Sequence, residues 1–491
     1  MRIDKILQPG ALVYFVGIKG TGVCALAELM QSTGVRVTGS DTSEVFYTDD
    51  VLKELQIPYF ENFDAARVNT NIDMVIHSSA YSTDSNPELA RAKELNIPVI
   101  KYTDALGAWS ARFDSIGICG VHGKTTTTAI TGVLMRAAGL PAQILTGSAA
   151  VDFGGRSTLT LGSKYFIAES CEYQKNFLSF HPRRIILTAV ESDHQDCFPT
   201  YESIRDAFVE YCRLLPSGGE LIYCADDPGA SEVAGIIENE NRGIVLVPYG
   251  FTALGDFRIV SYDVKDKRAI FSLAGINGEF KLRIPGRHQA LNASAAIALT
   301  VLLVKKEFES AEGSSLSGEI IQSIKTELEN FESTKRRSEI LGEADGILFM
   351  DDYGHHPTAI KTTLSGIKSF YPERRLIISF MSHTYTRTSA LLDGFASAFS
   401  DADIVFLHKI FGSAREKYSG GVDGRTLYEK AAALRNGKVY YIDEPEDAFE
   451  PLREILKSGD IFITLGAGSN SSLGKKLYSH FKSTNDTGEL L

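Results

Sequence analysis

One stretch of the chain, residues 115–128, restricts the possible folds more than any other. It contains an apolar, partly β-branched run, then a glycine turn, one lysine and four threonines, Ser-Ile-Gly-Ile-Cys-Gly-Val-His-Gly-Lys-Thr-Thr-Thr-Thr. A helix-compatible run, 129–138, comes next. A strand, a tight glycine loop and a helix in this order wrap backbone N–H groups, a helix N-terminus and one ammonium around a polyphosphate. The stretch therefore predicts an α/β domain that binds a nucleotide.

The loop departs from the usual phosphate-loop pattern in one respect. That pattern has more residues between its two glycines, whereas Gly120 and Gly123 enclose only Val121 and His122. We interpret the stretch as a shortened variant, in which Lys124 supplies the ammonium and a threonine hydroxyl holds Mg²⁺. We also expect the charge of Lys124 to serve a ligand and not the core, so that its removal leaves the fold intact.

The length of the chain requires several hydrophobic cores. At 491 residues it exceeds the size of a single domain, and the alternation of strand and helix patterns recurs in three segments. We therefore predict an α/β protein with three domains. They are a Rossmann-like domain at 1–108, a central P-loop-type nucleotide-binding domain with a mostly parallel sheet at 109–328, and a Rossmann-like domain at 329–491.

Composition argues against some partners. The net charge of −12 disfavours nonspecific binding to nucleic acid or to an anionic membrane, since both need a basic surface. The six cysteines contain no Cys-x-x-Cys pair, and we interpret them as buried free thiols in a reducing compartment. The N-terminal residues lack a signal-peptide core, and no apolar run is long enough to span a membrane. We expect a cytoplasmic protein.

The first segment has the layout of a nucleotide-binding fold. An apolar strand pattern at 12–16 precedes glycines at 17–22 and a helical run at 23–33, and a second strand at 35–39 leads to Asp41. An acidic residue at this distance is placed to accept a hydrogen bond from a ribose hydroxyl. The glycine spacing, G-x-x-G-x-G, differs from the NAD fingerprint, so an NAD-dependent dehydrogenase is disfavoured.

A further strand pattern in this segment, 74–77, ends in two serines. They could offer hydroxyl and N–H donors to a phosphate, although a plain polar loop explains them equally well. The candidate residues for the nucleotide site of the segment are Gly17, Gly20, Thr21, Gly22, Asp41, Ser78 and Ser79.

Polar residues follow two strand patterns of the central segment. A strand at 164–168 ends at Glu169, and a strand at 184–190 leads to Asp193 and His194. Ligands of open α/β sheets collect at the carboxyl ends of the strands, so these side chains are candidates for one site. Glu169 suits Mg²⁺ as a hard oxygen ligand, and His194 suits a second metal ion or a phosphate. The alternative for His194 is a structural histidine at a strand end.

The last segment contains four more strand patterns, which begin near residues 346, 375, 403 and 460. Each leads into a loop of functional residue types. The first of these loops contains Asp352, and the second contains His383 and Arg387. The repeated alternation predicts a third α/β domain.

Taken in chain order, these motifs resemble those of the Mur ligase family. The resemblance is carried by residues 17–22, 39–41, 120–128, 168–173, 193–194, 286–292, 336–337, 351–357 and 383–388. It covers nearly the whole chain and implies domains that bind a UDP-sugar, MgATP and an amino acid. It also implies ATP-dependent ligation of L-alanine to UDP-N-acetylmuramate through an acyl phosphate, with two Mg²⁺ ions, in the synthesis of peptidoglycan precursors.

The resemblance further implies roles for individual residues. Lys124 contacts the β and γ phosphates of ATP, Thr125 and Glu169 hold one Mg²⁺, and His194 holds a second. The amino acid is held by His383 and Arg387. The implied catalytic residues are Lys124, Glu169, His194 and Asp352. The implied ATP-binding residues are Gly120, His122, Gly123, Lys124, Thr125, Thr126, Asn292, Arg337 and Asp352. The chain departs from the family pattern at Ala189, Gln289 and Thr384.

Two other functions are left open by the motifs. A recycling ligase would add a preformed peptide to the same sugar nucleotide, and a switch would hydrolyse ATP or GTP without ligating anything. The base that takes the amine proton of alanine is Glu172, His194 or solvent. The expected partners are UDP-N-acetylmuramate, L-alanine and ATP, with neither nucleic acid nor membrane, and the expected assembly is a monomer or a homodimer.

Overall fold

The computed structural model describes residues 7–308, 318–412, 416, 418, 420–435 and 438–488. The chain forms two compact units. Unit 1 consists of residues 1–191, 205–258 and 293–327, and unit 2 consists of residues 192–204, 259–292 and 328–491. The sheets confirm the predicted α/β class with mostly parallel strands. The three predicted domain limits stay predictions. Among the helices of the described ranges, none combines the length and the apolar character needed to cross a bilayer.

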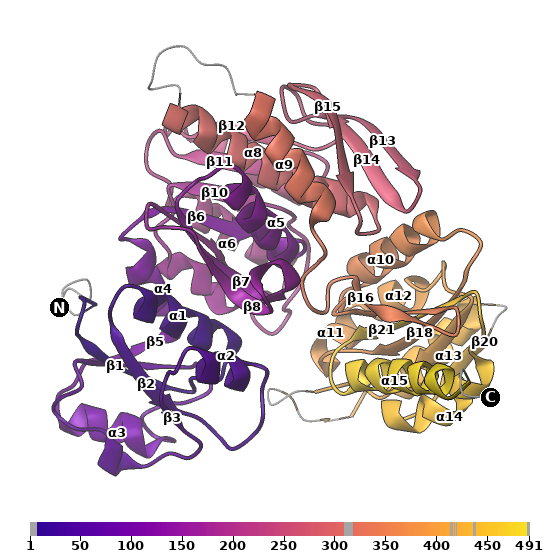
Figure 1. The fold of residues 1–491 in the computed structure, drawn as a ribbon, viewed down its shortest axis with the longest axis horizontal. Helices are drawn as coiled ribbons and strands as arrows, with labels where there is room; N and C mark the ends of the chain where they lie inside the picture. Colours follow the sequence, from indigo (N-terminus) through magenta and orange to yellow (C-terminus); the bar gives the residue numbers. More distant parts are fainter. Residues whose placement is uncertain are drawn as a thin grey trace. The chain divides into compact units, whose positions relative to one another are not determined.

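Unit 1 begins with a five-stranded parallel sheet, in the order β3-β2-β1-β4-β5 (Figure 1). Its strands are β1 (Leu12–Val16), β2 (Arg36–Ser40), β3 (Tyr59–Phe60), β4 (Met74–His77) and β5 (Val99–Lys101), and its helices are α1 (Thr21–Ser32), α2 (Thr48–Glu54), α3 (Pro87–Glu94) and α4 (Tyr102–Ser110). The central strand β1 is almost wholly apolar and buried, as expected for a strand covered on both faces. The strand order reverses between β1 and β4, so the glycine loop after β1 lies where ligands of such sheets bind.

Unit 1 also contains a seven-stranded sheet, in the order β12-β11-β10-β6-β9-β7-β8. All neighbours are parallel except β7 and β8. The strands are β6 (Asp114–Cys119), β7 (Ala142–Ala150), β8 (Arg156–Thr160), β9 (Tyr165–Glu169), β10 (Arg184–Leu187), β11 (Glu220–Cys224) and β12 (Val245–Tyr249). The associated helices are α5 (Lys124–Ala137), α6 (Tyr201–Cys212) and α7 (Pro228–Asn239). Because β6 lies between β9 and β10, the predicted phosphate loop and Glu169 meet at one edge of the sheet.

Unit 2 contains the meander β13-β14-β15 and a six-stranded sheet in the order β16-β17-β21-β18-β19-β20. The strands are β13 (Ile259–Lys265), β14 (Arg268–Leu273), β15 (Ile276–Leu282), β16 (Glu339–Ala344), β17 (Ile347–Asp352), β18 (Arg375–Met381), β19 (Ile404–Leu407), β20 (Lys438–Tyr441) and β21 (Asp460–Gly466). Its helices are α10 (Pro357–Phe370), α11 (Tyr385–Ala390), α12 (Leu392–Ser397), α13 (Gly424–Leu434), α14 (Phe449–Ile455) and α15 (Asn470–Gly488). Helices α8 (Arg287–Phe308) and α9 (Gly318–Asn330) belong mostly to unit 1, which includes residues 293–327. Two apolar clusters pack against the six-stranded sheet.

The cysteines are all free, as predicted, but not all are buried. Cys171 is exposed and Cys197 is half-buried, whereas Cys24, Cys119, Cys212 and Cys224 are buried. The two exceptions lie in polar loops that follow β9 and β10, outside any apolar run, so the expectation of burial was wrong for them.

A buried histidine lies in the core of the six-stranded sheet. His408 is 1% exposed, and its Nδ1 lies 2.8 Å from the carbonyl oxygen of Ile442. Its Nε2 lies 2.7 Å from the hydroxyl of Ser379. Burial lowers the pKa of His408 to about 4, because the imidazolium loses its hydration there.

This histidine predicts that the protein loses stability in mild acid. Between pH 6.5 and about pH 4, His408 is protonated in the unfolded chain but stays neutral in the folded protein. We expect the free energy of unfolding to fall across this window, with about 3 kcal/mol of the loss due to His408. Urea denaturation between pH 7 and pH 4 measures the slope. A His408→Gln variant has no such proton to bind, and an equal slope in both proteins would contradict the assignment.

Candidate active site

The phosphate loop joins β6 to α5 and depends on two glycines. Gly120 and Gly123 have φ angles of +129° and +83°, which favour glycine. A Cβ atom on Gly120 would lie 2.1 Å from the hydroxyl of Thr188, so a side chain there would collide with the loop after β10. The backbone N–H of Val121 donates to the carbonyl of Ala189 in the same loop over 2.9 Å. The two closely spaced glycines therefore form a tight turn, which the loop after β10 holds in place.

Helix α5 begins directly after this turn with an open N-terminus. No side chain caps it, and the first N–H groups of a helix lack partners within the helix and carry its positive end. Thr125 and Thr126 lie in this first turn, both nearly buried. The backbone carbonyl of His122 accepts a hydrogen bond from the hydroxyl of Thr188. The imidazole of His122 contacts the carboxylate of Glu191. The predicted ATP-binding residues Gly120 and 122–126 thus lie in one continuous turn, and the uncapped helix start suits an anion. Their contact with ATP stays a prediction.

Lys124 is held by a carboxylate that is itself buried. Its Nζ lies 2.9 Å and 3.0 Å from the two carboxylate oxygens of Glu172, and it also donates to the carbonyl of Gly120. Burial by itself lowers the pKa of the ammonium, but Glu172 more than reverses this effect, so the pKa of Lys124 is raised. Because Glu172 is only 1% exposed, Lys124 also neutralises a core charge. The expectation that its charge serves only a ligand was incomplete.

Thr125 and Glu169, the predicted ligands of one Mg²⁺, lie together. The hydroxyl of Thr125 donates to Oε2 of Glu169 over 2.8 Å, and the backbone N–H of Gly147 donates to the same oxygen over 2.8 Å. A Cβ atom on Gly147 would lie 2.4 Å from that oxygen, so the approach requires glycine. A hydroxyl and a carboxylate at this separation are hard oxygen donors that suit Mg²⁺.

The glycine loop after β1 is ordered by an aspartate. A Cβ atom on Gly17 would lie 2.8 Å from that of Ser78, so these two predicted residues are in contact. Asp41 is 6% exposed, and its carboxylate accepts from the backbone N–H groups of Lys19 over 2.7 Å and Thr42 over 2.8 Å. Asp41 therefore fixes the shape of the loop, and its contact with a ribose stays a prediction.

Lys19 lies inside the glycine loop, but acidic residues neutralise it. Its Nζ lies 2.9 Å from Asp49 and 3.0 Å from Glu61, and the residue is 1% exposed. The donors left for an anion are the backbone N–H groups of the first turn of α1, which has no capping side chain. This turn contains the predicted residues Thr21 and Gly22 and follows Gly20.

A buried ion pair lies in unit 2. Nε of Arg387 donates to Asp193 over 2.7 Å, and the two side chains are 4% and 2% exposed. Although burial alone raises the pKa of Asp193, the guanidinium holds it well below its ordinary value. The other Arg387 nitrogens lie 3.1 Å from Nδ1 of His383 and 3.4 Å from Nδ1 of His194. The structure thus brings both predicted amino-acid-binding residues together with His194, whose metal role stays a prediction.

Asp352 is buried and holds two loops of unit 2. Its oxygens accept from the backbone N–H groups of Ser338 and Gly354, each over 2.6 Å, and burial raises its pKa. Arg337 precedes Ser338, and its guanidinium forms no hydrogen bond or salt bridge with the described part of the chain. Its guanidinium lies 5.6 Å from the ring centre of Tyr353. Asp352 therefore orders the loop that presents Arg337, the predicted phosphate ligand.

Asn292 lies in the second turn of α8 and is 7% exposed. Its side-chain amide donates to the side-chain oxygen of Gln289 over 3.0 Å. Gln289, a departure from the family pattern, therefore fixes the orientation of the Asn292 amide. The contact of Asn292 with a nucleotide stays a prediction.

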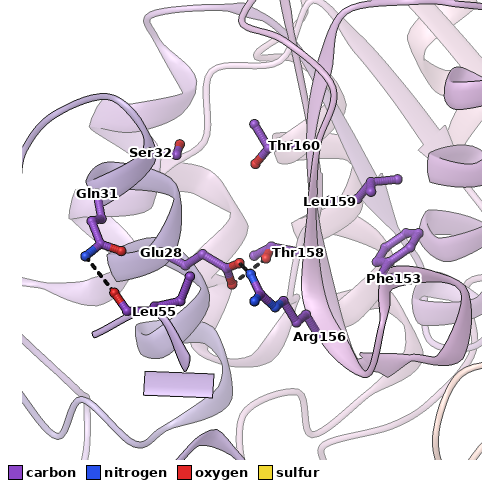
Figure 2. Close-up of a pocket in the computed structure, with 9 residues that line it drawn as sticks. All are labelled: Glu28, Gln31, Ser32, Leu55, Phe153, Arg156, Thr158, Leu159 and Thr160. Atoms are coloured by element: carbon purple, nitrogen blue, oxygen red, sulfur yellow. Dashed lines mark hydrogen bonds and ion pairs between the residues drawn. The ribbon is translucent and has the colours of Figure 1, made fainter. Parts of the chain in front are cut away.

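A separate pocket of about 540 Å³ lies in unit 1 between α1 and the β7–β8 hairpin (Figure 2). Glu28 of α1 pairs with Arg156 over 2.8 Å and accepts from the hydroxyl of Thr158 over 2.5 Å. Arg156 also pairs with Glu54 over 2.6 Å. None of the predicted site residues lines this pocket, and its ion pairs instead fasten α1 to β8.

Comparisons with known proteins agree with this geometry along the whole chain. Family models match in succession at residues 12–114 (Mur ligase family, catalytic domain), 118–300 (Mur ligase middle domain) and 336–468 (Mur ligase, glutamate ligase domain). The chain belongs to the Mur ligase family. It is therefore an ATP-dependent ligase that forms amide bonds.

Two curated Mur ligases are similar over nearly their full length. The UDP-N-acetylmuramate–L-alanine ligase of Treponema pallidum (strain Nichols) is 47% identical over 96% of this chain and 97% of its own. The enzyme of the same name from Borreliella burgdorferi is 40% identical over 93% and 96%. Among solved Mur ligase structures, the UDP-N-acetylmuramate-alanine ligase of Thermotoga maritima has a TM-score of 0.74 at 23% identity, covering 96% of this chain and 99% of that one. At this identity the structure supports the fold alone.

Proposed function

We propose that the protein ligates L-alanine to UDP-N-acetylmuramate at the expense of ATP, in the synthesis of peptidoglycan precursors. The observation that carries the proposal is the 47% identity, over 96% of the chain, to a UDP-N-acetylmuramate–L-alanine ligase. The uncapped N-termini of two helices, α1 and α5, also support it. Unit 1 contains two open helix N-termini, one after the glycine loop at 17–22 and one after the phosphate loop at 120–123, so one chain offers two anion-binding turns.

The first chemical step activates a carboxylate, which is a poor acyl donor. A carboxylate oxygen of the sugar nucleotide attacks the γ phosphorus of ATP and forms an acyl phosphate, and ADP leaves. Lys124 and the N–H groups of α5 stabilise the charge that develops on the transferred group. To contact phosphate, the Lys124 ammonium exchanges at least one of its bonds to Glu172. Bound Mg²⁺ would neutralise phosphate charge, with Thr125 and Glu169 as its ligands in unit 1.

The second step forms the amide bond. The neutral amine of alanine attacks the acyl carbon, and phosphate leaves through a tetrahedral intermediate. We assign the alanine carboxylate to His383 and Arg387, because a guanidinium pairs well with a carboxylate. Of the three Arg387 side-chain nitrogens only Nε donates to Asp193, so the two terminal nitrogens can turn from the imidazoles toward a ligand. Glu172 is a weak candidate for the base, because both its oxygens accept from Lys124.

A cytoplasmic location and a second Mg²⁺ at His194 complete the proposal. The location is supported by ATP as co-substrate and by the six free cysteines, which fit a reducing compartment. The protein would work as a monomer or a homodimer.

Comparing acceptors tests the proposal against its alternatives. With UDP-N-acetylmuramate and MgATP, we expect product with L-alanine and none with a tripeptide that begins with L-alanine. Efficient use of the tripeptide would instead indicate a recycling ligase. A murein peptide ligase of Psychrobacter arcticus has a similar fold, with a TM-score of 0.64 at 21% identity over 96% of this chain and 99% of its own. Phosphate release that is unchanged without either acceptor would indicate a hydrolytic switch.

A further inference from the structure

The ammonium of Lys124 has an acceptor within hydrogen-bond distance for each of its three protons. Two acceptors are the carboxylate oxygens of Glu172, at 3.0 Å and 2.9 Å from Nζ, and the third is the carbonyl oxygen of Gly120. An ammonium has three donors and no more. A phosphate oxygen can therefore bind Nζ only by displacing one of these acceptors. Because Glu172 supplies two of them, Lys124 can release one carboxylate oxygen and keep the other.

The segment that carries Glu172 is anchored to the sheet. The backbone N–H of Ser170 donates to the carbonyl of Ile118 in β6 over 2.9 Å, and the hydroxyl of Tyr211 donates to that of Ser170 over 3.0 Å. The side chain of Glu172 is itself only 2% exposed. The carboxylate therefore keeps its place, and the long, flexible side chain of Lys124 is the part that can turn.

Two carboxylates lie at the start of α5. The consecutive residues Lys124 and Thr125 contact Glu172 over 2.9 Å and Glu169 over 2.8 Å. Bound Mg²⁺ would neutralise Glu169, whereas Glu172 is neutralised by Lys124. A phosphate that takes a bond from Lys124 therefore leaves a buried carboxylate less well compensated, which is unfavourable. The free energy of nucleotide binding is reduced by this amount.

We propose that Glu172 competes with nucleotide phosphate for Lys124 and thereby sets the affinity for ATP and ADP. The inference rests on the proposed function, in which Lys124 contacts the β and γ phosphates. Glu172 holds the ammonium beside the phosphate loop, gives up one bond when ATP binds and regains it when ADP dissociates. It is a positioning residue, since it acts on the nucleotide through Lys124. Its effect is to weaken nucleotide binding and to speed the release of ADP.

Binding of ADP in the presence of Mg²⁺ tests this competition. Glu172→Gln removes the charge and keeps the shape of the side chain, so Lys124 can turn to phosphate without leaving a buried anion. We expect this variant to bind MgADP about tenfold more tightly in titration calorimetry, because a hydrogen bond to a charged group is no longer given up. The dissociation rate of ADP, measured by stopped-flow, should fall by a similar factor. The KM for ATP should fall, whereas the KM for L-alanine should not.

The same substitution in a Lys124→Met background separates competition from direct repulsion. Competition requires the ammonium, and without it a buried Glu172 takes up a proton. Lys124→Met and the double variant should therefore bind MgADP with similar affinity, and more weakly than the parent protein. An equal gain from Glu172→Gln in both backgrounds would show that Glu172 repels the phosphate directly, which would overturn the proposal. Binding by Lys124→Met as tight as that of the parent protein would also overturn it.

Two further variants complete the comparison. Glu172→Asp keeps the charge but withdraws the carboxylate by one methylene, so binding of MgADP should tighten less than in Glu172→Gln. This variant keeps a counter-charge for Lys124 and tests the proposal even if Glu172→Gln does not fold. Glu28→Gln is the matched control, because Glu28 is a largely buried carboxylate of α1 that pairs with Arg156 over 2.8 Å. It should bind MgADP like the parent protein.

Unchanged or weaker binding of MgADP in both Glu172 variants would overturn the competition. Ligation of L-alanine by the parent protein is measured separately. Its absence would overturn the proposed function, and the ADP measurements would still decide whether Glu172 and phosphate compete for Lys124.

Discussion

Replacing Lys124 with methionine is expected to lower turnover by at least about a thousandfold, because one ammonium supplies much of the charge that stabilises the transferred phosphoryl group. Methionine keeps the length and apolar stem of the side chain, so the start of α5 stays packed. Phosphate release in the presence of both acceptor substrates measures the loss.

The same substitution should also destabilise the protein. Lys124 is the partner of Glu172, and the two side chains are 12% and 2% exposed. Removing the ammonium leaves a buried carboxylate without a counter-charge, which lowers the free energy of unfolding by about 3 kcal/mol. Urea denaturation measures this loss in the free energy of unfolding separately from activity.

The double variant Lys124→Met with Glu172→Gln separates the two roles. Glutamine has the shape of glutamate without its charge, so we expect stability to return toward that of the parent protein while ligation stays absent. Recovery of turnover in the double variant would show that Lys124 matters only as the partner of Glu172.

Replacing Glu169 with glutamine is expected to lower turnover by at least about a hundredfold and to raise the Mg²⁺ concentration needed for half-maximal rate. The amide oxygen can still accept from Thr125 and from Gly147, so the fold should persist. A matched control is Glu94→Gln, since Glu94 is an exposed residue of α3 paired with Arg91 over 2.9 Å. A Mg²⁺ dependence of Glu169→Gln equal to that of the parent protein would remove Glu169 from the metal site.

Local patterns predicted the elements that carry the site, because the signal lies in consecutive residues. The strand before the phosphate loop, the glycine turn and the following helix appear as β6, residues 120–123 and α5. The strand expected at 184–190 ends earlier, at Leu187, and the residues after it bind the phosphate loop instead. The patterns missed β16 and β20, the partly exposed strands at the two edges of their sheet. Gly342 and Glu343 interrupt the apolar residues of β16, and β20 has only 4 residues.

Tertiary contacts decide what the candidate residues touch, and no local pattern encodes them. Gly147 lies far in sequence from Glu169 and meets it only because β7 pairs with β9. Thr188 supports the phosphate loop for the same kind of reason, since β10 pairs with β6. The ion pair between Asp193 and Arg387 likewise could not be predicted from a local pattern, because the two residues lie far apart in sequence and meet only in the folded protein.

Transfer of oxygen from substrate to phosphate tests the central claim most directly. The protein is incubated with MgATP, L-alanine and UDP-N-acetylmuramate that carries ¹⁸O in its carboxylate, and the released phosphate is examined by mass spectrometry. The acyl-phosphate route predicts ¹⁸O in that phosphate, because the attacking carboxylate oxygen leaves with the phosphorus. Formation of the alanine-containing product with unlabelled phosphate would contradict it.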